Sequence, residues 1–280
     1  LSFSISEYGT AISPPYIEHL LSERVKSIEI SGIRRAWALA QGCDDLVNLS
    51  IGQPDFPVHE TIKQAAVDAI LQDKNGYTQT EGIEALLHAI HNRLRAQFGW
   101  DFGEASQHGA MVTAGTAGAL TLACLSVLGP GDEVIVPDPY FVIYPTLARI
   151  AGATAVLCDT YPDFRMTAQR IELCITERTK AVIINSPANP TGIVLTTKEV
   201  EEIAELCHNR GILLITDEIY DEFVFSPTEH ASPAATNDDV LVIRGYGKTY
   251  GCTGWRMGYA AGPKVLIDNM LKLKQQTFVC

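Results

Sequence analysis

The sequence predicts an α/β fold in which helices cover a mostly parallel sheet. Six short apolar runs, several of them rich in valine and isoleucine, recur between residues 110 and 244, and helical segments lie between them. Strands that are apolar on both sides are typical of a sheet buried on both faces, and the intervening helices favour a parallel arrangement. A chain of 280 residues with 46% hydrophobic content is long enough to bury such a core.

The N-terminal part is expected to precede the sheet. Its first 45 residues, which include Pro14 and Pro15, predict an extended arm followed by a helix over 23–41. A short strand over 46–51 and helices over 58–72 and 81–97 come next. No linker rich in proline, glycine or serine separates this part from the rest.

The sheet region alternates strands and helices. The expected strands span 110–113, 133–136, 154–158, 181–185, 212–217 and 240–244. The expected helices between them span 116–128, 140–150 and 197–210. The last helix has a start signal, Thr197 followed by Glu199, and Gly211 is expected to end it.

Composition narrows the functional classes. Lys and Arg total 21 against 33 Asp and Glu, giving a net charge of −12, which argues against nucleic acid and anionic membranes as partners. No apolar stretch reaches the roughly 20 residues that span a bilayer. Seven cysteines without a CxxC pair favour reduced thiols and, because the first residues lack a signal-peptide pattern, a cytoplasmic location.

Polar residues follow five of the expected strands. Ligands bind beyond the carboxyl ends of strands in sheets of this kind, so we expect one cleft to gather these segments. The segments are 113–116, 138–141, 185–192, 217–220 and 245–248.

Two of these segments carry an acid and an amide. Asp217 ends the apolar strand in ILLITDEIYDE, where a buried carboxylate is costly unless a cation offsets it; capping of a following helix is the alternative. In SPANPTG, two prolines and a glycine stiffen a loop that would hold Asn189 in one direction, and an ordinary turn is the alternative.

Two further segments suit cofactor binding. In RGYGKTYGCTGWRMGY, Lys248 lies among glycines and aromatic residues, and Arg256 follows eight residues later. The P-loop and dinucleotide patterns are both excluded, because Val242 and Tyr250 stand where they need glycine. In VTAGTAGAL, small residues at the start of a helix either leave free N–H groups for an anion or allow tight packing on the sheet.

Together the four motifs resemble the fold-type I pyridoxal-phosphate enzymes, specifically the class I/II aminotransferases, from about Val25 to Tyr259. The resemblance implies a three-layer α/β/α fold with a mostly parallel seven-stranded sheet. Residues 51–280 would form the large domain, and residues 1–50 would contribute an arm and a helix to an incomplete small domain. It also implies transamination between an L-amino acid and a 2-oxo acid, with pyridoxal 5'-phosphate as the cofactor.

The resemblance assigns catalytic roles to individual residues. Lys248 would hold the cofactor as a Schiff base and then shuttle a proton, and Asp217 would keep the pyridinium nitrogen protonated. Asn189 and Tyr220 would bond the phenolic oxygen of the ring, and Phe141 would stack on the ring.

Further residues would bind the phosphate and the substrate. The phosphate would be surrounded by Gly115, Thr116, Ala117, Arg256 and, from the neighbouring subunit of a homodimer with shared sites, Tyr77. Gly52 and Asn189 would contact the substrate. No metal site is expected, since His88 and His91 lie at helical spacing without a third ligand nearby.

The sequence departs from the family in two places. Glycines stand at 245 and 247, where the family usually has serines, the first of which helps hold the phosphate. The chain also stops at Cys280, before the family's arginine that binds the substrate α-carboxylate, so we expect a fragment and leave open whether it functions alone. The resemblance also places a cis peptide bond at Asp138–Pro139, at Asn189–Pro190, or at both.

Other activities remain as alternatives. A lyase, decarboxylase or synthase would use the same cofactor, with Lys248 and Asp217 in the same roles. A non-catalytic sensor that binds pyridoxal phosphate is the alternative outside enzymes, although such regulators usually carry a DNA-binding module and the N-terminal arm here is short and not basic. The segment SIGQPDF favours an aminotransferase.

Overall fold

The computed structural model describes residues 17–28 and 52–278, together with positions 32, 39, 45, 47 and 49. The 17–28 segment contains a 3-10 helix, η1 (Glu18–Leu20), and a short helix, α1 (Glu23–Lys26). Most of the strand expected over 46–51 and most of the helix expected over 23–41 lie outside the described residues.

A single seven-stranded sheet organises the described residues. Its strands lie in the order β1-β7-β6-β5-β4-β2-β3. Neighbouring strands are parallel except for β7, which runs antiparallel to both β1 and β6. The bounds are β1 (His108–Ala114), β2 (Glu133–Asp138), β3 (Thr154–Asp159), β4 (Thr179–Asn185), β5 (Leu213–Asp217), β6 (Val240–Gly245) and β7 (Met257–Pro263).

The strand β7 has no counterpart among the six apolar runs of the sequence. Its residues, MGYAAGP, are mostly small and have little intrinsic preference for strands. Small size is required here, because a Cβ atom at Gly258 would lie 2.8 Å from the backbone carbon of Gly115. Close approach of the neighbouring backbone therefore selects a sequence that does not resemble a strand.

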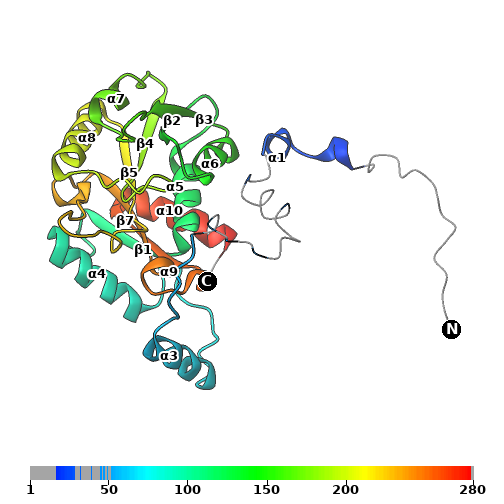
Figure 1. Cartoon of the computed structure of the whole chain (residues 1–280). Coiled ribbons are helices and arrows are strands. Elements are labelled where there is room, and N and C mark those ends of the chain that lie inside the picture. Colours follow the sequence, from blue (N-terminus) through cyan, green and yellow to red (C-terminus); the bar gives the residue numbers. More distant parts are fainter. Residues whose placement is uncertain are drawn as a thin grey trace.

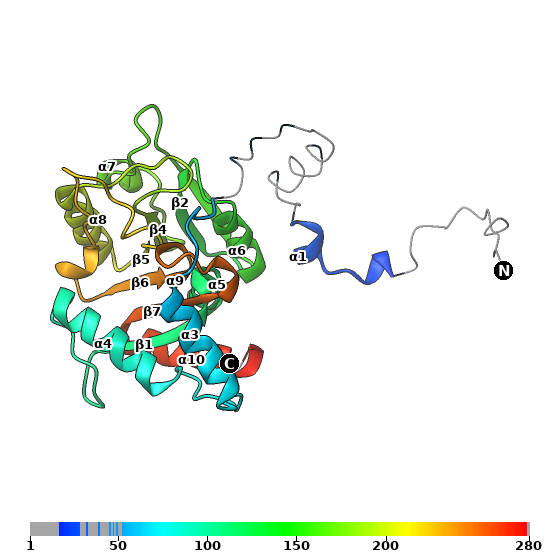
Figure 2. The ribbon, with the colours of Figure 1, turned by 60° about the horizontal axis from the view of Figure 1, so that its bottom comes forward.

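Helices cover both faces of the sheet and confirm the three-layer fold (Figures 1 and 2). One face packs against α5 (Gly115–Val127), α6 (Ile143–Ala151) and α10 (Lys264–Thr277). The other packs against α4 (Glu84–Phe98), α7 (Ala168–Glu172) and α8 (Thr197–Arg210). Successive strand residues alternate between the two cores: Ile183 belongs to the first, and Val182 and Ile184 belong to the second.

Local signals explain the helix ends. The helix α8 spans the expected 197–210, but its N-cap is Thr196, one residue earlier than the sequence suggested, and Thr196 forms a capping box with Glu199. Gly211 ends α8 in the left-handed conformation, with a φ of 64°. The helices α4 and α6 each begin three residues later than expected.

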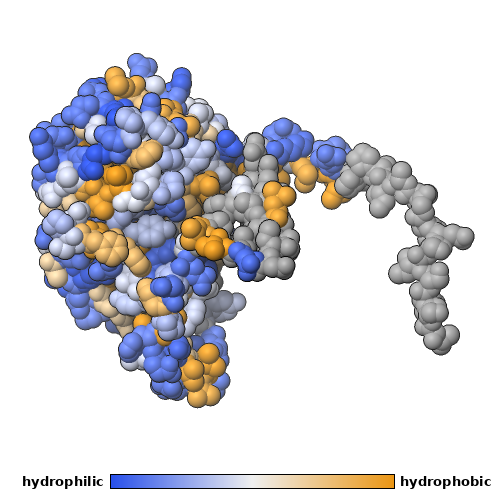
Figure 3. Space-filling view, viewed as in Figure 1, coloured by the Kyte–Doolittle hydropathy of each residue, from blue (hydrophilic) through white to orange (hydrophobic). Residues whose placement is uncertain are grey.

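The helix α3 (Glu60–Leu71) contributes no buried residue to either core. It lies beside the body of the molecule at the bottom of Figure 1, and its end is apolar on the surface in Figure 3. Val67, Ile70 and Leu71 are 45%, 65% and 76% exposed. Among the described residues, no helix combines the length and apolar character needed to cross a membrane.

Candidate active site

Lys248 follows β6 on the short helix α9 (Tyr246–Thr249). Its ammonium group donates a hydrogen bond to the carbonyl of Gly52 and lies 5.6 Å from the centre of the Tyr220 ring. Burial, together with the nearby charge of Arg256, lowers the pKa of Lys248. The structure thus brings together Lys248, Tyr220 and Gly52 from segments far apart in the sequence.

The loop after β4 is tied to the end of β5. The Asn189 side chain donates to the Tyr220 hydroxyl at 3.4 Å. The backbone N–H of Asn189 donates to the side-chain oxygen of Asn185 at 2.6 Å, and the Asn185 amide donates to the carbonyl of Asp217 at 2.8 Å. Asn185 is buried, and sequence reasoning assigned it no role, although a buried polar residue at the end of an apolar strand is a signal for one.

Asp217 is only 2% exposed. The hydroxyl of Tyr144 donates to one carboxylate oxygen at 2.9 Å, and the N–H of Ile219 donates to the other at 3.3 Å. Burial raises the pKa of Asp217 to about 6, against the lowering effect of these two hydrogen bonds. No ion pair to Asp217 forms among the residues that the structure describes.

Two further observations concern the surroundings of Asp217. The residues that follow it form a turn instead of a helix, so the helix-capping alternative is wrong. Phe141 packs edge-on against Tyr144, with ring centres 5.7 Å apart. Tyr144 was missed in the sequence because its position on an apolar helix is typical of an ordinary core aromatic.

A small-residue cradle forms at the start of α5. Gly115 has a φ of +66°, and a Cβ atom there would lie 2.9 Å from Nη2 of Arg256. Thr116 and Ala117 occupy the first turn of this helix. A helix N-terminus with free N–H groups beside a guanidinium favours an anion, which supports the anion-site interpretation over simple packing.

Neighbouring side chains explain why position 245 is a glycine. Its backbone is extended, with a φ of −150°, so any residue could adopt its conformation. A Cβ atom, however, would lie 2.6 Å from Cδ1 of Ile219 and 3.1 Å from Cγ2 of Thr116. The space for a serine side chain is therefore filled by two neighbouring methyl groups.

Tyr77 is a predicted site residue that the structure does not bring to the other site residues of the same chain. Its side chain is 96% exposed, in the connection between α3 and α4. Tyr77 therefore does not pack against the residues of its own chain that the structure describes. The prediction about proline bonds is confirmed, because Asp138–Pro139 and Asn189–Pro190 are both cis.

The arrangement fits pyridoxal phosphate. A buried carboxylate without a cationic partner in the described part of the chain suits a protonated ring nitrogen. The cradle at Gly115, which a Cβ atom would fill, suits a phosphate. Lys248, whose pKa is lowered, follows β6, which is separated from β1 by only one strand, β7. Fold and site together define a pyridoxal-phosphate enzyme of fold type I.

Comparison with known proteins identifies the family. Residues 44–280 match the family described as aminotransferase class I and II, and the chain belongs to it. The cofactor of this family is pyridoxal 5'-phosphate, and the reaction that it catalyses is transamination.

Individual relatives are moderately similar. The putative aminotransferase YugH of Bacillus subtilis is 36% identical over 93% of this chain and 68% of its own length. The probable aspartate aminotransferase of Methanocaldococcus jannaschii is 34% identical, over 93% of this chain and 70% of its own. The solved aspartate aminotransferase of Thermus thermophilus with maleate superposes with a TM-score of 0.86, at 36% identity, over 92% of this chain and 69% of its own. The chain thus spans about two thirds of the length of its relatives.

Proposed function

We propose that Lys248, Asp217 and Tyr220 are the catalytic residues of a transamination between an L-amino acid and a 2-oxo acid. The observation that carries the proposal is the buried Asp217 carboxylate, which lacks a cationic partner within the described residues and has its pKa raised to about 6. A protonated ring nitrogen would remove the cost of this charge.

The three residues have separate tasks. When bound, the cofactor supplies an electron sink for charge that develops at the substrate Cα. Lys248 would take the proton from the substrate Cα and deliver it to the cofactor carbon that receives the amino group, and its lowered pKa raises the share of neutral amine that a base needs. Asp217 holds a proton on the ring nitrogen, and the Tyr220 hydroxyl, fixed by Asn189, orients the ring oxygen.

The remaining site residues hold the cofactor and the substrate. Phe141 would cover the ring, and Gly52 and Asn189 would meet the substrate carboxylate. The phosphate would be bound by the first turn of α5 and a guanidinium, that is, by Gly115, Thr116, Ala117 and Arg256. Support comes from the free N–H groups of that turn and from the position of Arg256 above Gly115.

Covalent labelling tests the lysine assignment. Borohydride reduction of the cofactor-loaded, full-length protein, followed by peptide mapping, should give one labelled lysine, at position 248. Lys63→Ala, which removes a lysine from a pocket that Tyr250 also lines, should leave the label in place. A label on another lysine would refute the assignment.

We also propose a homodimer in which Tyr77 completes the site of the other subunit. Two observations support it: Tyr77 is 96% exposed, and the neighbouring helix α3 exposes Val67, Ile70 and Leu71. A phosphate with about two negative charges needs several donors, and a hydroxyl at position 245 is absent here.

Complementation tests the shared site. Chains with Tyr77→Phe and chains with Lys248→Ala are mixed, so that each heterodimer has one site with both defects and one site with neither. Activity should then exceed that of either variant alone. A monomeric mass at working concentration, with no complementation, would contradict the proposal.

The location and domain division remain proposals. The free thiols at Cys124, Cys158, Cys174, Cys207 and Cys252 support a reducing, cytoplasmic setting. We retain residues 51–280 as the large domain and residues 1–50 as a contribution to a second, smaller one.

A further inference from the structure

A group of buried charges lies behind the proposed site and takes no part in it. Arg244, on β6, is 3% exposed, and Glu218, directly after β5, is fully buried. Both Nε and Nη2 of Arg244 lie 2.8 Å from the same oxygen of Glu218. Burial alone would raise the pKa of Glu218, but the charge of Arg244 and the imidazole of His230, whose Nε2 lies 3.2 Å from the carboxylate, hold it at about 2.

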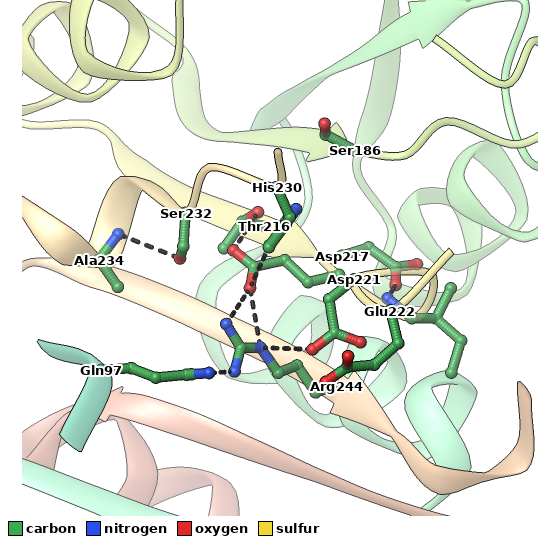
Figure 4. A network of polar contacts seen from close by, with 12 residues as sticks. Gln97, Ser186, Thr216, Asp217, Asp221, Glu222, His230, Ser232, Ala234 and Arg244 are labelled. Atoms are coloured by element: carbon green, nitrogen blue, oxygen red, sulfur yellow. Dashed lines mark hydrogen bonds and ion pairs between the residues drawn. The ribbon is translucent and has the colours of Figure 1, made fainter. Parts of the chain in front are cut away.

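The guanidinium of Arg244 has further partners. Its Nη1 donates to the side-chain oxygen of Gln97, from α4, at 2.5 Å, and its Nε lies 3.4 Å from Asp221. Figure 4 shows these contacts around the guanidinium, with the Asp217 carboxylate directed away from it. Asp221 also accepts a hydrogen bond from Arg93 of α4 at 2.8 Å. The group therefore links α4, β6 and the turn after β5.

The side chains of the turn after β5 point to two opposite sides. Asp217 and Tyr220 point to the proposed site, where they contact Tyr144 and Asn189. Glu218 and Asp221, each the next residue along, point to the opposite side and meet Arg244.

Arg244 is also tied to the lysine segment. It lies on β6, four residues before Lys248. Next to it, the carbonyl of Ile243 accepts the N–H of Glu218 at 2.8 Å. One guanidinium thus connects the turn that carries Asp217 and Tyr220 with the strand that leads to Lys248.

We propose that Arg244 is a positioning residue, which fixes Asp217 and Tyr220 relative to Lys248 by pairing with Glu218 and Asp221. The inference rests on the roles proposed above for the three site residues. A buried ion pair is a weak source of stability, since desolvation offsets most of the attraction, but its hydrogen bonds have fixed directions. An arginine suits the task because its planar fork engages two carboxylates at once, whereas a lysine would act as a point charge.

Four variants of the full-length, cofactor-loaded protein test this inference. Arg244→Lys keeps the charge, and Arg244→Met removes it. Arg244→Met combined with Glu218→Gln removes the charge together with the carboxylate it would leave unpaired. Arg178→Met is the control away from the site, because Arg178, although itself exposed, also pairs with a buried carboxylate, Glu133, at the opposite, N-terminal ends of the strands.

The measurements separate geometry from stability. We expect kcat about tenfold lower in Arg244→Lys and at least as low in Arg244→Met, with KM for the amino acid within about twofold. The midpoint of the pH titration of cofactor absorbance should shift in both variants. The double variant should regain melting temperature but neither kcat nor the absorbance midpoint, and Arg178→Met should lower only the melting temperature.

Two outcomes would overturn the inference. Recovery of kcat and of the absorbance midpoint in the double variant would mean that Arg244 only compensates a buried charge. Wild-type kcat and absorbance in Arg244→Lys, a variant that keeps the charge and so the fold, would mean that its geometry is unimportant. Failure of the proposed function is distinguishable, because a borohydride label away from Lys248 would appear in the unmodified protein.

Discussion

Replacing Asp217 by asparagine tests two effects of this carboxylate separately: its effect on the free energy of unfolding and its effect on the transamination rate. Asparagine keeps the shape and removes the charge. Its oxygen can still accept from the N–H of Ile219, and the Tyr144 hydroxyl can rotate to accept from its amide. The variant therefore changes the electrostatics and leaves the hydrogen bonds satisfied.

The raised pKa fixes the sign and size of the effect. Asp217 titrates at about 6 in the fold, against a usual value of 3.8, so folding favours its protonated form. The stability that this group contributes is fully present below pH 3.8 and is lost as the pH rises through 6. Above pH 7 the ionised carboxylate costs about 3 kcal/mol of unfolding free energy, and at pH 4.5 about 1 kcal/mol.

Urea unfolding of the cofactor-free protein measures this difference. Asp217→Asn should be more stable than wild type by about 3 kcal/mol at pH 7.5 and by about 1 kcal/mol at pH 4.5. The same variant, loaded with cofactor, should lose most of its transamination rate. Asp268→Asn, an exposed carboxylate on α10, should change stability by less than about 0.5 kcal/mol at either pH. A gain independent of pH, or undiminished turnover, would refute the reasoning.

Three further predictions concern groups around the site. Tyr144→Phe removes a hydrogen bond that lowers the pKa of Asp217, and kcat should fall about tenfold, since hydrogen bonds to charged groups are among the stronger ones; an unchanged kcat would leave Tyr144 a packing role only. Gly115→Ala places a methyl group against the guanidinium at a φ of +66°, so equilibrium dialysis should find cofactor affinity reduced at least about tenfold, and wild-type affinity would argue against the cradle. Gly245→Ser should lower the melting temperature, and Ile219→Val in the same chain should restore part of it; a neutral Gly245→Ser would show that the neighbouring methyl groups yield.

The sequence by itself determined the layered architecture, and it singled out the residues that we propose for the centre of the site. Apolar runs of valine and isoleucine marked six of the seven strands, because burial on both faces leaves a local pattern. Asp217 stood out because it ends an apolar strand, and Asn189 and Lys248 because they lie in the short segments after two others, where ligands bind in sheets of this kind.

Only the tertiary structure decided the rest. The strand β7 has glycines at 258 and 262 because the backbones of Gly115 and Val240 approach them closely, and its own sequence does not resemble a strand. Tyr144 is separated from Asp217 by 73 residues, and Gln97 from Arg244 by 147, so neither pair leaves a trace at short range. Periodicity records whether a residue is buried, whereas the partner that it meets there depends on how the whole chain packs, which no local pattern contains.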